Sequence, residues 1–202
     1  MVKRSYIIIL TIFIVLLIDQ VLKVWIKTNM YLGQEYSVIG NWFLIHFTEN
    51  EGMAFGMTLG GGFGKLALSI FRIIAIIIIG WYLFYLSRMR SNKGLIFSIS
   101  LIFVGALGNI VDSAFYGLLF SQSSFHTIAS FLPEGGGYGG FLHGEVVDMF
   151  YFPILYGTYP EWFPWKGGDS FIFFRPVFNI ADSAITTGVI ILIVFQRKFF
   201  KK

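Results

Sequence analysis

The sequence predicts an all-α membrane protein with four transmembrane helices, a small β-sheet outside the membrane and long loop insertions at the membrane interface. Of its 202 residues, 56% are hydrophobic and only 13% are charged, and the mean hydropathy is +0.74. This hydropathy is well above that of soluble domains. Four apolar stretches each approach the ~20 residues that a helix needs to cross a bilayer. We therefore predict one integral membrane domain over residues 1–202.

The first apolar stretch covers residues 5–26 and follows Lys3 and Arg4. A basic start before an apolar run is also typical of a secretory signal peptide. No small-x-small cleavage site follows, however, and the run continues through Lys23 and Trp25 to transmembrane length. We therefore predict a first transmembrane helix.

The other three apolar stretches predict helices over 66–87, 95–118 and 177–197. Basic residues decide their orientation, because nine of the fifteen Lys and Arg residues lie near one set of helix ends: Lys3, Arg4, Arg88, Arg90, Lys93, Arg197, Lys198, Lys201 and Lys202. The positive-inside rule makes this side cytoplasmic, so both termini are expected inside. The same clustering favours membrane lipids over nucleic acid as the anionic partner.

The two longer polar segments, residues 27–65 and 119–176, then lie on the outer side. The first contains alternating patches such as 42–47, which predict short strands at the membrane interface. The second is rich in Gly, Pro and aromatic residues, as in 135–140 and 159–165. We expect it to be loop that dips into the headgroup layer, where Trp and Tyr are favoured.

Three predicted helices carry a carboxylate at similar depth. Asp19, Asp112 and Asp182 lie about 21–25 Å from the cytoplasmic ends of their helices, at about 1.5 Å per residue. An ionisable group in a membrane span is expensive, so its default interpretation is functional. Lys23 follows Asp19 by four residues, which favours a local structural ion pair. Asp112 shares a helix face with Asn109 and two glycines, which favours a supporting interhelical hydrogen-bond network.

Asp148 and Asp182 are the candidate catalytic pair. Asp182 has no basic residue within one helical turn and shares a helix face with Asn179. Asp148 lies between apolar residues at 146–147 and 149–152, and such surroundings raise the pKa of a carboxyl group by desolvation. Two carboxylates that meet can share a proton, so that one activates water while the other protonates the carbonyl or the leaving amine, as in aspartic proteases.

Other chemistries are less well supported. The absence of cysteine excludes thiolate catalysis and disulfides. His46, His126 and His143 lie in the outer segments without a clear serine partner or a metal-ligand spacing, so we expect neither metal nor cofactor. A proton- or cation-coupled transporter is the main alternative, since carboxylates between helices also act as relays, although no internal repeat is present. A non-catalytic scaffold would leave the paired aspartates unexplained.

Five motifs, in order along nearly the whole chain, resemble those of lipoprotein signal peptidases, the type II signal peptidases of bacteria. They are Asp19-Gln20 with Lys23, the run from Asn50 to Gly56, Gly105 with Gly108-Asn109 and Asp112, Val146-Val147-Asp148, and the run from Phe178 to Ser183. The resemblance implies an aspartyl endopeptidase of the bacterial inner membrane that acts near the periplasmic face without metal or organic cofactor. It would cut diacylglyceryl-modified prolipoproteins before the lipidated cysteine, with Asp148 and Asp182 as the catalytic pair.

The resemblance also implies which residues line or brace the substrate site: Asn50, Gly52, Gly105, Gly108, Asn109, Asp112 and Asn179. We add Ala181, Asp19 and Lys23 as supporting candidates. This chain departs from the family in two respects. Ser113 stands where the family usually has arginine, and segments 114–145 and 149–176 are longer than usual. We expect Arg72 or Arg175 to supply the missing cation. The expected partners are lipid-modified prolipoproteins and membrane lipids, and the expected state is a monomer.

Overall fold

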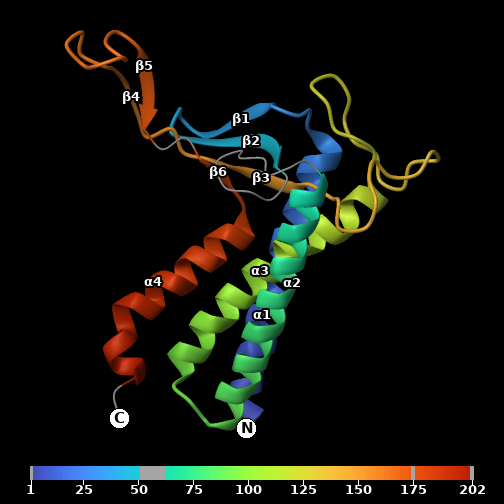
Figure 1. Cartoon of the computed structure of the whole chain (residues 1–202), viewed down its shortest axis with the longest axis vertical. Helices are drawn as coiled ribbons and strands as arrows, with labels where there is room; N and C mark the ends of the chain where they lie inside the picture. Colours follow the sequence, from blue (N-terminus) through green and yellow to red (C-terminus); the bar gives the residue numbers. More distant parts are fainter. Residues whose placement is uncertain (1, 51–61, 174–175, 201–202) are drawn as a thin grey trace.

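The computed structural model describes residues 2–50, 62–173 and 176–200. Within these ranges the chain forms helices α1 (Val2–Asn29), α2 (Gly62–Arg88), α3 (Lys93–Leu119) and α4 (Ile180–Phe200), and strands β1 (Glu35–Ile39), β2 (Phe43–Asn50), β3 (Val146–Tyr151), β4 (Leu155–Thr158), β5 (Ser170–Phe173) and β6 (Val177–Phe178). Figure 1 shows the helices on one side of the main sheet, and α1 begins and α4 ends at the end of the bundle away from it.

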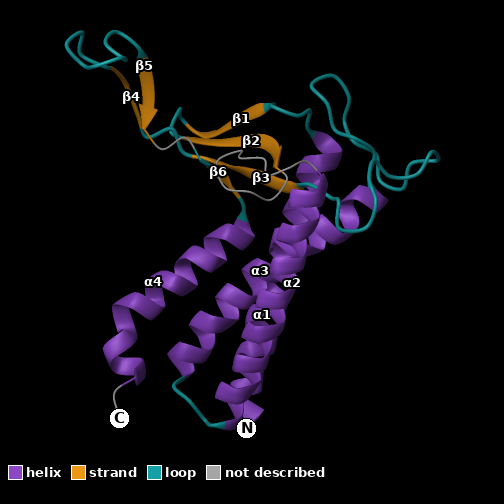
Figure 2. Cartoon of the chain, viewed as in Figure 1, coloured by secondary structure: helices purple, strands orange, loops and turns teal. Residues whose placement is uncertain are grey.

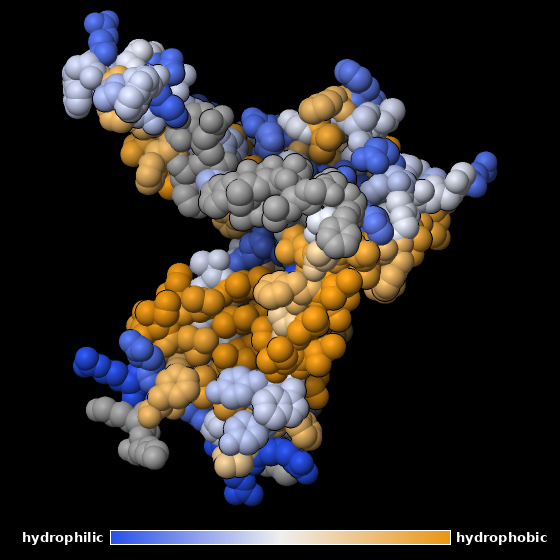
Figure 3. Space-filling model, in the orientation of Figure 1, coloured by the Kyte–Doolittle hydropathy of each residue, from blue (hydrophilic) through white to orange (hydrophobic). Residues whose placement is uncertain are grey.

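Each of the four helices is long and apolar enough to cross a membrane, with spans of 21 to 27 residues and mean hydropathies of 1.5 to 2.6. Large apolar side chains project outward from them, including Phe13 on α1, Ile77 on α2 and Ile193 on α4. Figure 3 shows apolar surface over the helices and hydrophilic surface at both ends of the bundle. In a bilayer these side chains contact acyl chains rather than water, so the predicted four-helix membrane fold is confirmed.

The central helix of the bundle is α3. In an apolar stretch of 18 residues along α3, 61% of the residues are buried, whereas the corresponding share in the other three helices is 11% to 17%. Close packing of α3 on α4 depends on glycine, because a Cβ atom at Gly105 would lie 2.2 Å from the carbonyl oxygen of Ala181 and 2.6 Å from Ile185 Cγ1. Small residues at such crossings let two backbones approach. This contact sets the start of α4 against the middle of α3.

The fourth helix begins later than the sequence predicted. The expected helix covered 177–197, whereas Val177–Phe178 forms β6, and α4 starts at Ile180. The reason is strand pairing, since Phe178 pairs with Phe150 of β3. Asn179 then caps the helix: its side-chain oxygen accepts from the backbone N–H of Asp182 at 2.9 Å, and the Asp182 carboxylate accepts from the backbone N–H of Asn179 at 3.3 Å. This reciprocal arrangement is a capping box.

The main sheet is antiparallel with the strand order β1-β2-β3-β6, and it lies across the helix ends that are away from the two chain termini (Figure 2). The predicted strand patch 42–47 corresponds to much of β2. In β2 and β3, Asn50 pairs with Val146 and Thr48 with Asp148, so the ends of these strands lie together. One face of the sheet covers an apolar core made of Ile26, Met30, Phe47, Tyr116, Phe120, Val147 and Met149.

The two long insertions have different structures. Residues 120–145 form loop that runs back over the C-terminal end of α3, where the N–H groups of Gly139 and Gly144 donate to the carbonyl oxygens of Gly117 and Ser113, both at 2.8 Å. In the second insertion the sequence predicted only loop, but β4 and β5 pair there as a hairpin that projects away from the main sheet (Figure 1). Each of its strands has only four residues, which is too short for a clear alternating pattern.

Candidate active site

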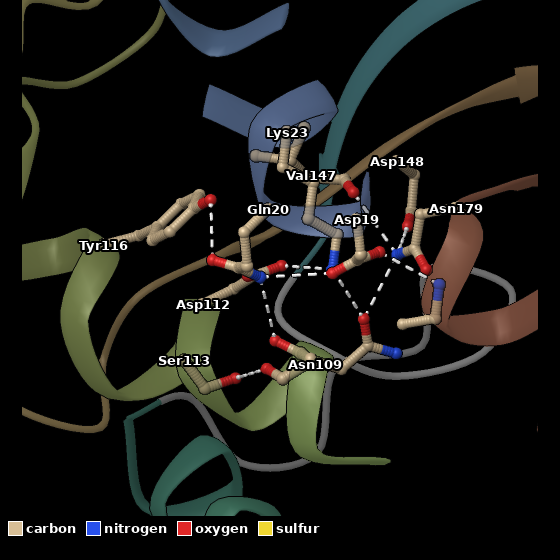
Figure 4. A network of polar contacts seen from close by, with 12 residues as sticks. Asp19, Gln20, Lys23, Asn109, Asp112, Ser113, Tyr116, Val147, Asp148 and Asn179 are labelled. Carbon is tan, nitrogen blue, oxygen red and sulfur yellow. Dashed lines mark hydrogen bonds and ion pairs between the residues drawn. The ribbon is translucent and has the colours of Figure 1, made fainter. Parts of the chain in front are cut away.

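Polar side chains from five elements meet where the helices reach the sheet. They come from α1, α3 and the start of α4, and from the neighbouring ends of β2 and β3. Figure 4 shows several of these side chains pointing toward one another. Most are buried, and hydrogen bonds or ion pairs compensate for the loss of water, as buried polar groups require.

Asp148 is held on β3 between the core residues Val147 and Met149, and only 3% of it is exposed. Its Oδ1 accepts a hydrogen bond from Asn179 Nδ2 at 2.7 Å, and its Oδ2 accepts one from Asn50 Nδ2. Burial, and next the negative charge of Asp182, raise the pKa of Asp148 from 3.8 to about 8. The direction agrees with the desolvation expected from its apolar neighbours.

Asp182 lies in the first turn of α4 and is partly buried. Asn109 Nδ2 donates to its Oδ1 at 2.8 Å, and the backbone N–H of Asn179 donates to its Oδ2. The positive end of the helix dipole favours a negative charge at this position. The two carboxylates therefore have unlike surroundings: Asp182 lies partly buried at a helix N-terminus, and Asp148 lies buried between apolar core residues.

Two asparagines connect the carboxylates. Asn179 donates to Asp148 and caps the helix turn that carries Asp182, while Asn109 donates to Asp182 directly. Asn109 Oδ1 accepts from Lys23 Nζ at 2.9 Å and from Asn179 Nδ2 at 3.2 Å. Because this oxygen faces two donors, the amide must turn its N–H group toward Asp182. Asn109 is thus oriented by its partners rather than by its own helix.

Lys23 is the centre of a buried charge cluster. Its ammonium group lies 2.9 Å from Asp19 Oδ2 and 2.7 Å from Asp112 Oδ2, and all three side chains are almost fully buried. The sequence suggested a pair that satisfied itself locally within the first helix. That interpretation was incomplete, because the same lysine also binds Asp112 and Asn109 of α3. The cluster therefore joins two helices and orients one of the bridging asparagines.

Asp19 also fixes the position of α4. Its Oδ1 accepts a hydrogen bond from the backbone N–H of Ala181 at 2.9 Å, one of the N–H groups that a helix start leaves unpaired. Gly108 allows this approach, because a Cβ atom there would lie 2.8 Å from Asp19 Oδ2 and 3.1 Å from Ala181 Cβ. Asp19, Gly108 and Ala181 thus form the contact of three helices directly behind Asp182.

The sequence analysis gave no role to two members of the network, although Gln20 stands in the first motif. Gln20 donates from Nε2 to Asp112 Oδ1 at 2.9 Å and to Asp19 Oδ2 at 3.1 Å. Tyr116 donates from its hydroxyl group to Gln20 Oε1 at 3.2 Å. Tyr116 follows Asp112 by four residues on α3, and this spacing could have placed it on the same face.

Gly52 and Arg175 lie outside the described residues. Ser113 donates its hydroxyl hydrogen to Asn109 O of its own helix at 3.1 Å. Arg72 on α2 is close enough for its charge to interact with those of Asp182, Asp112 and Asp148. Of the two arginines proposed from the sequence, Arg72 is the one that lies within the described residues, and its role as the missing cation stays a prediction.

Comparison with known proteins gives consistent matches. The family model for signal peptidase (SPase) II matches residues 11–198. A lipoprotein signal peptidase of Porphyromonas gingivalis is 51% identical over 182 residues, covering 90% of this chain and 78% of the relative. One of Amoebophilus asiaticus is 38% identical over 183 residues, covering 89% and 73% of the two chains.

A solved structure of a bacterial membrane enzyme, determined by the in meso method at 2.3 Å resolution, has the same fold. It is 30% identical and superposes with a TM-score of 0.60, covering 96% of this chain and 91% of that chain. These matches argue against the transporter and scaffold alternatives and agree with the resemblance found in the motifs. The chain is a multi-pass membrane protein that belongs to the signal peptidase II family.

Proposed function

We propose that this protein is an aspartyl endopeptidase that removes signal peptides from diacylglyceryl-modified prolipoproteins, cutting before the lipidated cysteine. Asp148 and Asp182 are the catalytic pair. One observation carries the assignment: the two carboxylates come from different elements, are connected through Asn179 and Asn109, and have unlike surroundings. Family membership supports the substrate class.

The unlike surroundings divide the chemical roles. Asp148, whose pKa is raised to about 8, holds a proton near pH 7. Asp182, at the N-terminus of α4, acts as the base and takes a proton from water, which then attacks the scissile carbonyl carbon. Asp148 gives its proton to the carbonyl oxygen, forming a tetrahedral intermediate. When the C–N bond breaks, the proton on Asp182 passes to the leaving amine, and the carbonyl reforms as the hydroxyl proton returns to Asp148.

The surrounding hydrogen bonds and ion pairs hold the catalytic groups in position. Lys23 and Asn179 turn the amide of Asn109 toward Asp182, and Asp19 holds the start of α4 through Ala181. None of these side chains needs to change protonation during the reaction. Preorganised groups of this kind lower the barrier because they need not reorient as charge develops.

The proposed setting is the bacterial inner membrane, with both termini cytoplasmic, the site near the periplasmic face and the protein acting as a monomer among membrane lipids. The basic residues at the helix ends support this topology. Figure 3 shows a hollow beside the helices, with hydrophilic surface at its inner end and apolar surface on the helix side. A substrate that is partly in the bilayer could enter such a hollow from the side. Reporter fusions that place either terminus outside would contradict the topology.

The test uses purified full-length protein in detergent with a diacylglyceryl-modified prolipoprotein, followed by the decrease in substrate size. Wild-type protein should cleave it, whereas Asp148→Asn and Asp182→Asn should not, and the double variant should be little worse than either single one. Asp169→Asn is the matched control, because Asp169 is exposed between β4 and β5. Failure of the wild-type protein to cleave, or turnover by either site variant in a preparation free of host peptidase, would overturn the proposal.

A further inference from the structure

A second buried lysine lies one helical turn beyond Lys23. Lys27 is 0% exposed and forms an ion pair with Glu49 of β2, whose side chain is 3% exposed. Among the described residues Glu49 Oε2 has no hydrogen-bond partner, so compensation for burying this carboxylate depends on Lys27. Removing one member of a buried ion pair leaves an uncompensated charge. Nothing in the proposed chemistry uses this pair.

The other contacts of Lys27 come from the first long insertion, residues 120–145. Its ammonium group donates to Ser123 Oγ at 2.9 Å. It also lies over the aromatic rings of Tyr138 and Phe120, 4.9 Å and 5.6 Å from their centroids. Both distances are within the range of a cation–π interaction. Lys27 thus joins α1 and β2 to the insertion.

The insertion also holds the beginning of β3. The hydroxyl oxygen of Tyr138 accepts a hydrogen bond from the backbone N–H of Glu145 at 2.7 Å. Glu145 directly precedes Val146, the first residue of β3. Tyr138 therefore contacts Lys27 with its ring and the entrance to β3 with its hydroxyl group.

These contacts meet at the strand ends that carry a key hydrogen bond of the site. Glu49 directly precedes Asn50, and it pairs across the sheet with Val147, the residue before Asp148. Asn50 donates to Asp148 Oδ2. A shift of either strand end would change this bond, because both of its partners lie within three residues of an anchored position.

We propose that Lys27, Glu49, Ser123 and Tyr138, named here the Lys27 clamp, position Asn50 against Asp148. In this role the insertion 120–145 acts as a brace for the two strands. The residues of the clamp are positioning residues, since they act through Asn50 and touch neither water nor substrate in the proposed reaction. The proposal rests on the proposed function only in that Asp148 is catalytic.

Two single variants test the clamp. Tyr138→Phe keeps the ring over Lys27 but removes the acceptor for Glu145 N–H, while Glu49→Gln removes the charge and keeps the size. Each should lower kcat by roughly 10- to 100-fold, the range that small misplacement of a reacting group causes, with little change in KM. Glu35→Gln is the matched control, because Glu35 pairs with His46 on the same sheet but is 47% exposed, and it should leave both constants unchanged.

The pH dependence of cleavage separates positioning from stability. Loss of the Asn50 donor disfavours the ionised form of Asp148, so the basic limb of the profile should move to higher pH in the clamp variants. A merely structural role would reduce the amount of folded enzyme and leave the limb in place. If Glu49→Gln does not fold, the test rests on Tyr138→Phe, since that variant leaves the ion pair between Lys27 and Glu49 intact.

If Tyr138→Phe has a normal kcat and the basic limb of its pH profile is unchanged, the proposed role of the Lys27 clamp is wrong. Cleavage by the wild type would in that case still support the proposed function. Activity retained by Asp148→Asn would overturn the proposed function itself.

Discussion

Replacing Asp148 with Asn should stabilise the folded protein near pH 7 and abolish cleavage. Asp148 is buried, and its pKa is raised from 3.8 to about 8. In the unfolded chain the carboxyl group recovers its ordinary pKa and ionises well below pH 7. Folding near pH 7 therefore takes up a proton, which costs free energy. Asparagine has a similar size and carries no such cost.

The size of the gain follows from the structure. The interval from 3.8 to pH 7 corresponds to about 4 kcal/mol of lost stability, at about 1.4 kcal/mol per pKa unit. The Asp148→Asn variant would not recover all of it, because Asn179 Nδ2 and Asn50 Nδ2 both donate to this side chain. The new amide would turn its own N–H group toward one of these donors. An unmatched buried donor costs about 1–3 kcal/mol, so the expected net gain is about 1–3 kcal/mol.

The sign of the pH dependence is also determined. Between the unfolded pKa and the folded pKa, the folded state binds more protons than the unfolded state, so wild-type stability falls as pH rises from about 4 to about 8. Below this window Asp148 is protonated in both states. The advantage of Asp148→Asn should therefore disappear near pH 4, where only the unmatched donor remains.

Thermal unfolding of purified protein in detergent, measured near pH 7 and near pH 4.5, tests this reasoning. Asp169→Asn is again the control, because Asp169 is exposed and the substitution should change neither stability nor cleavage. This prediction would be refuted if the Asp148→Asn variant unfolded at a lower temperature than wild type near pH 7. It would also be refuted if the difference in unfolding temperature between variant and wild type were the same at both pH values. Retained cleavage would refute the catalytic assignment.

Further predictions concern the rest of the network. Cleavage should decrease above about pH 8 as Asp148 loses its proton; a profile that stays flat to pH 10 would contradict its role as the acid. Lys23→Met leaves two buried carboxylates without their cation and should cost roughly 3–5 kcal/mol of stability, seen as a lower unfolding temperature. Arg72→Gln should lower kcat/KM more than Lys166→Gln, an exposed control; equal activities would remove Arg72 from the site.

Local sequence patterns were sufficient for the membrane-spanning elements. Each apolar stretch had the length and hydropathy of a span, and in the structure each became a helix within a few residues of the predicted limits. The later start of α4 has a non-local cause, because Phe178 pairs with Phe150 in the sheet. Strand pairing depends on a partner far along the chain, which hydropathy within one stretch cannot reveal.

For the candidate site, the sequence supplied residue types and helix faces. The depth of Asp19, Asp112 and Asp182 followed from helical rise, and the motifs suggested Asp148 as the partner of Asp182. The contacts themselves could not be derived in this way. Lys23 is four residues from Asp19, yet the Asn109 side chain that it orients is 86 residues away.

The tertiary structure alone decided which polar groups satisfy one another. Asp19 accepts from the N–H of Ala181, 162 residues later, and Lys27 binds Glu49 together with Ser123 of the insertion. The sequence determines where helices form, because hydropathy and helical spacing act over neighbouring residues. The partners of a buried charge depend on which helices pack together, and that packing follows from side-chain shape across the whole chain, as at Gly105 and Gly108.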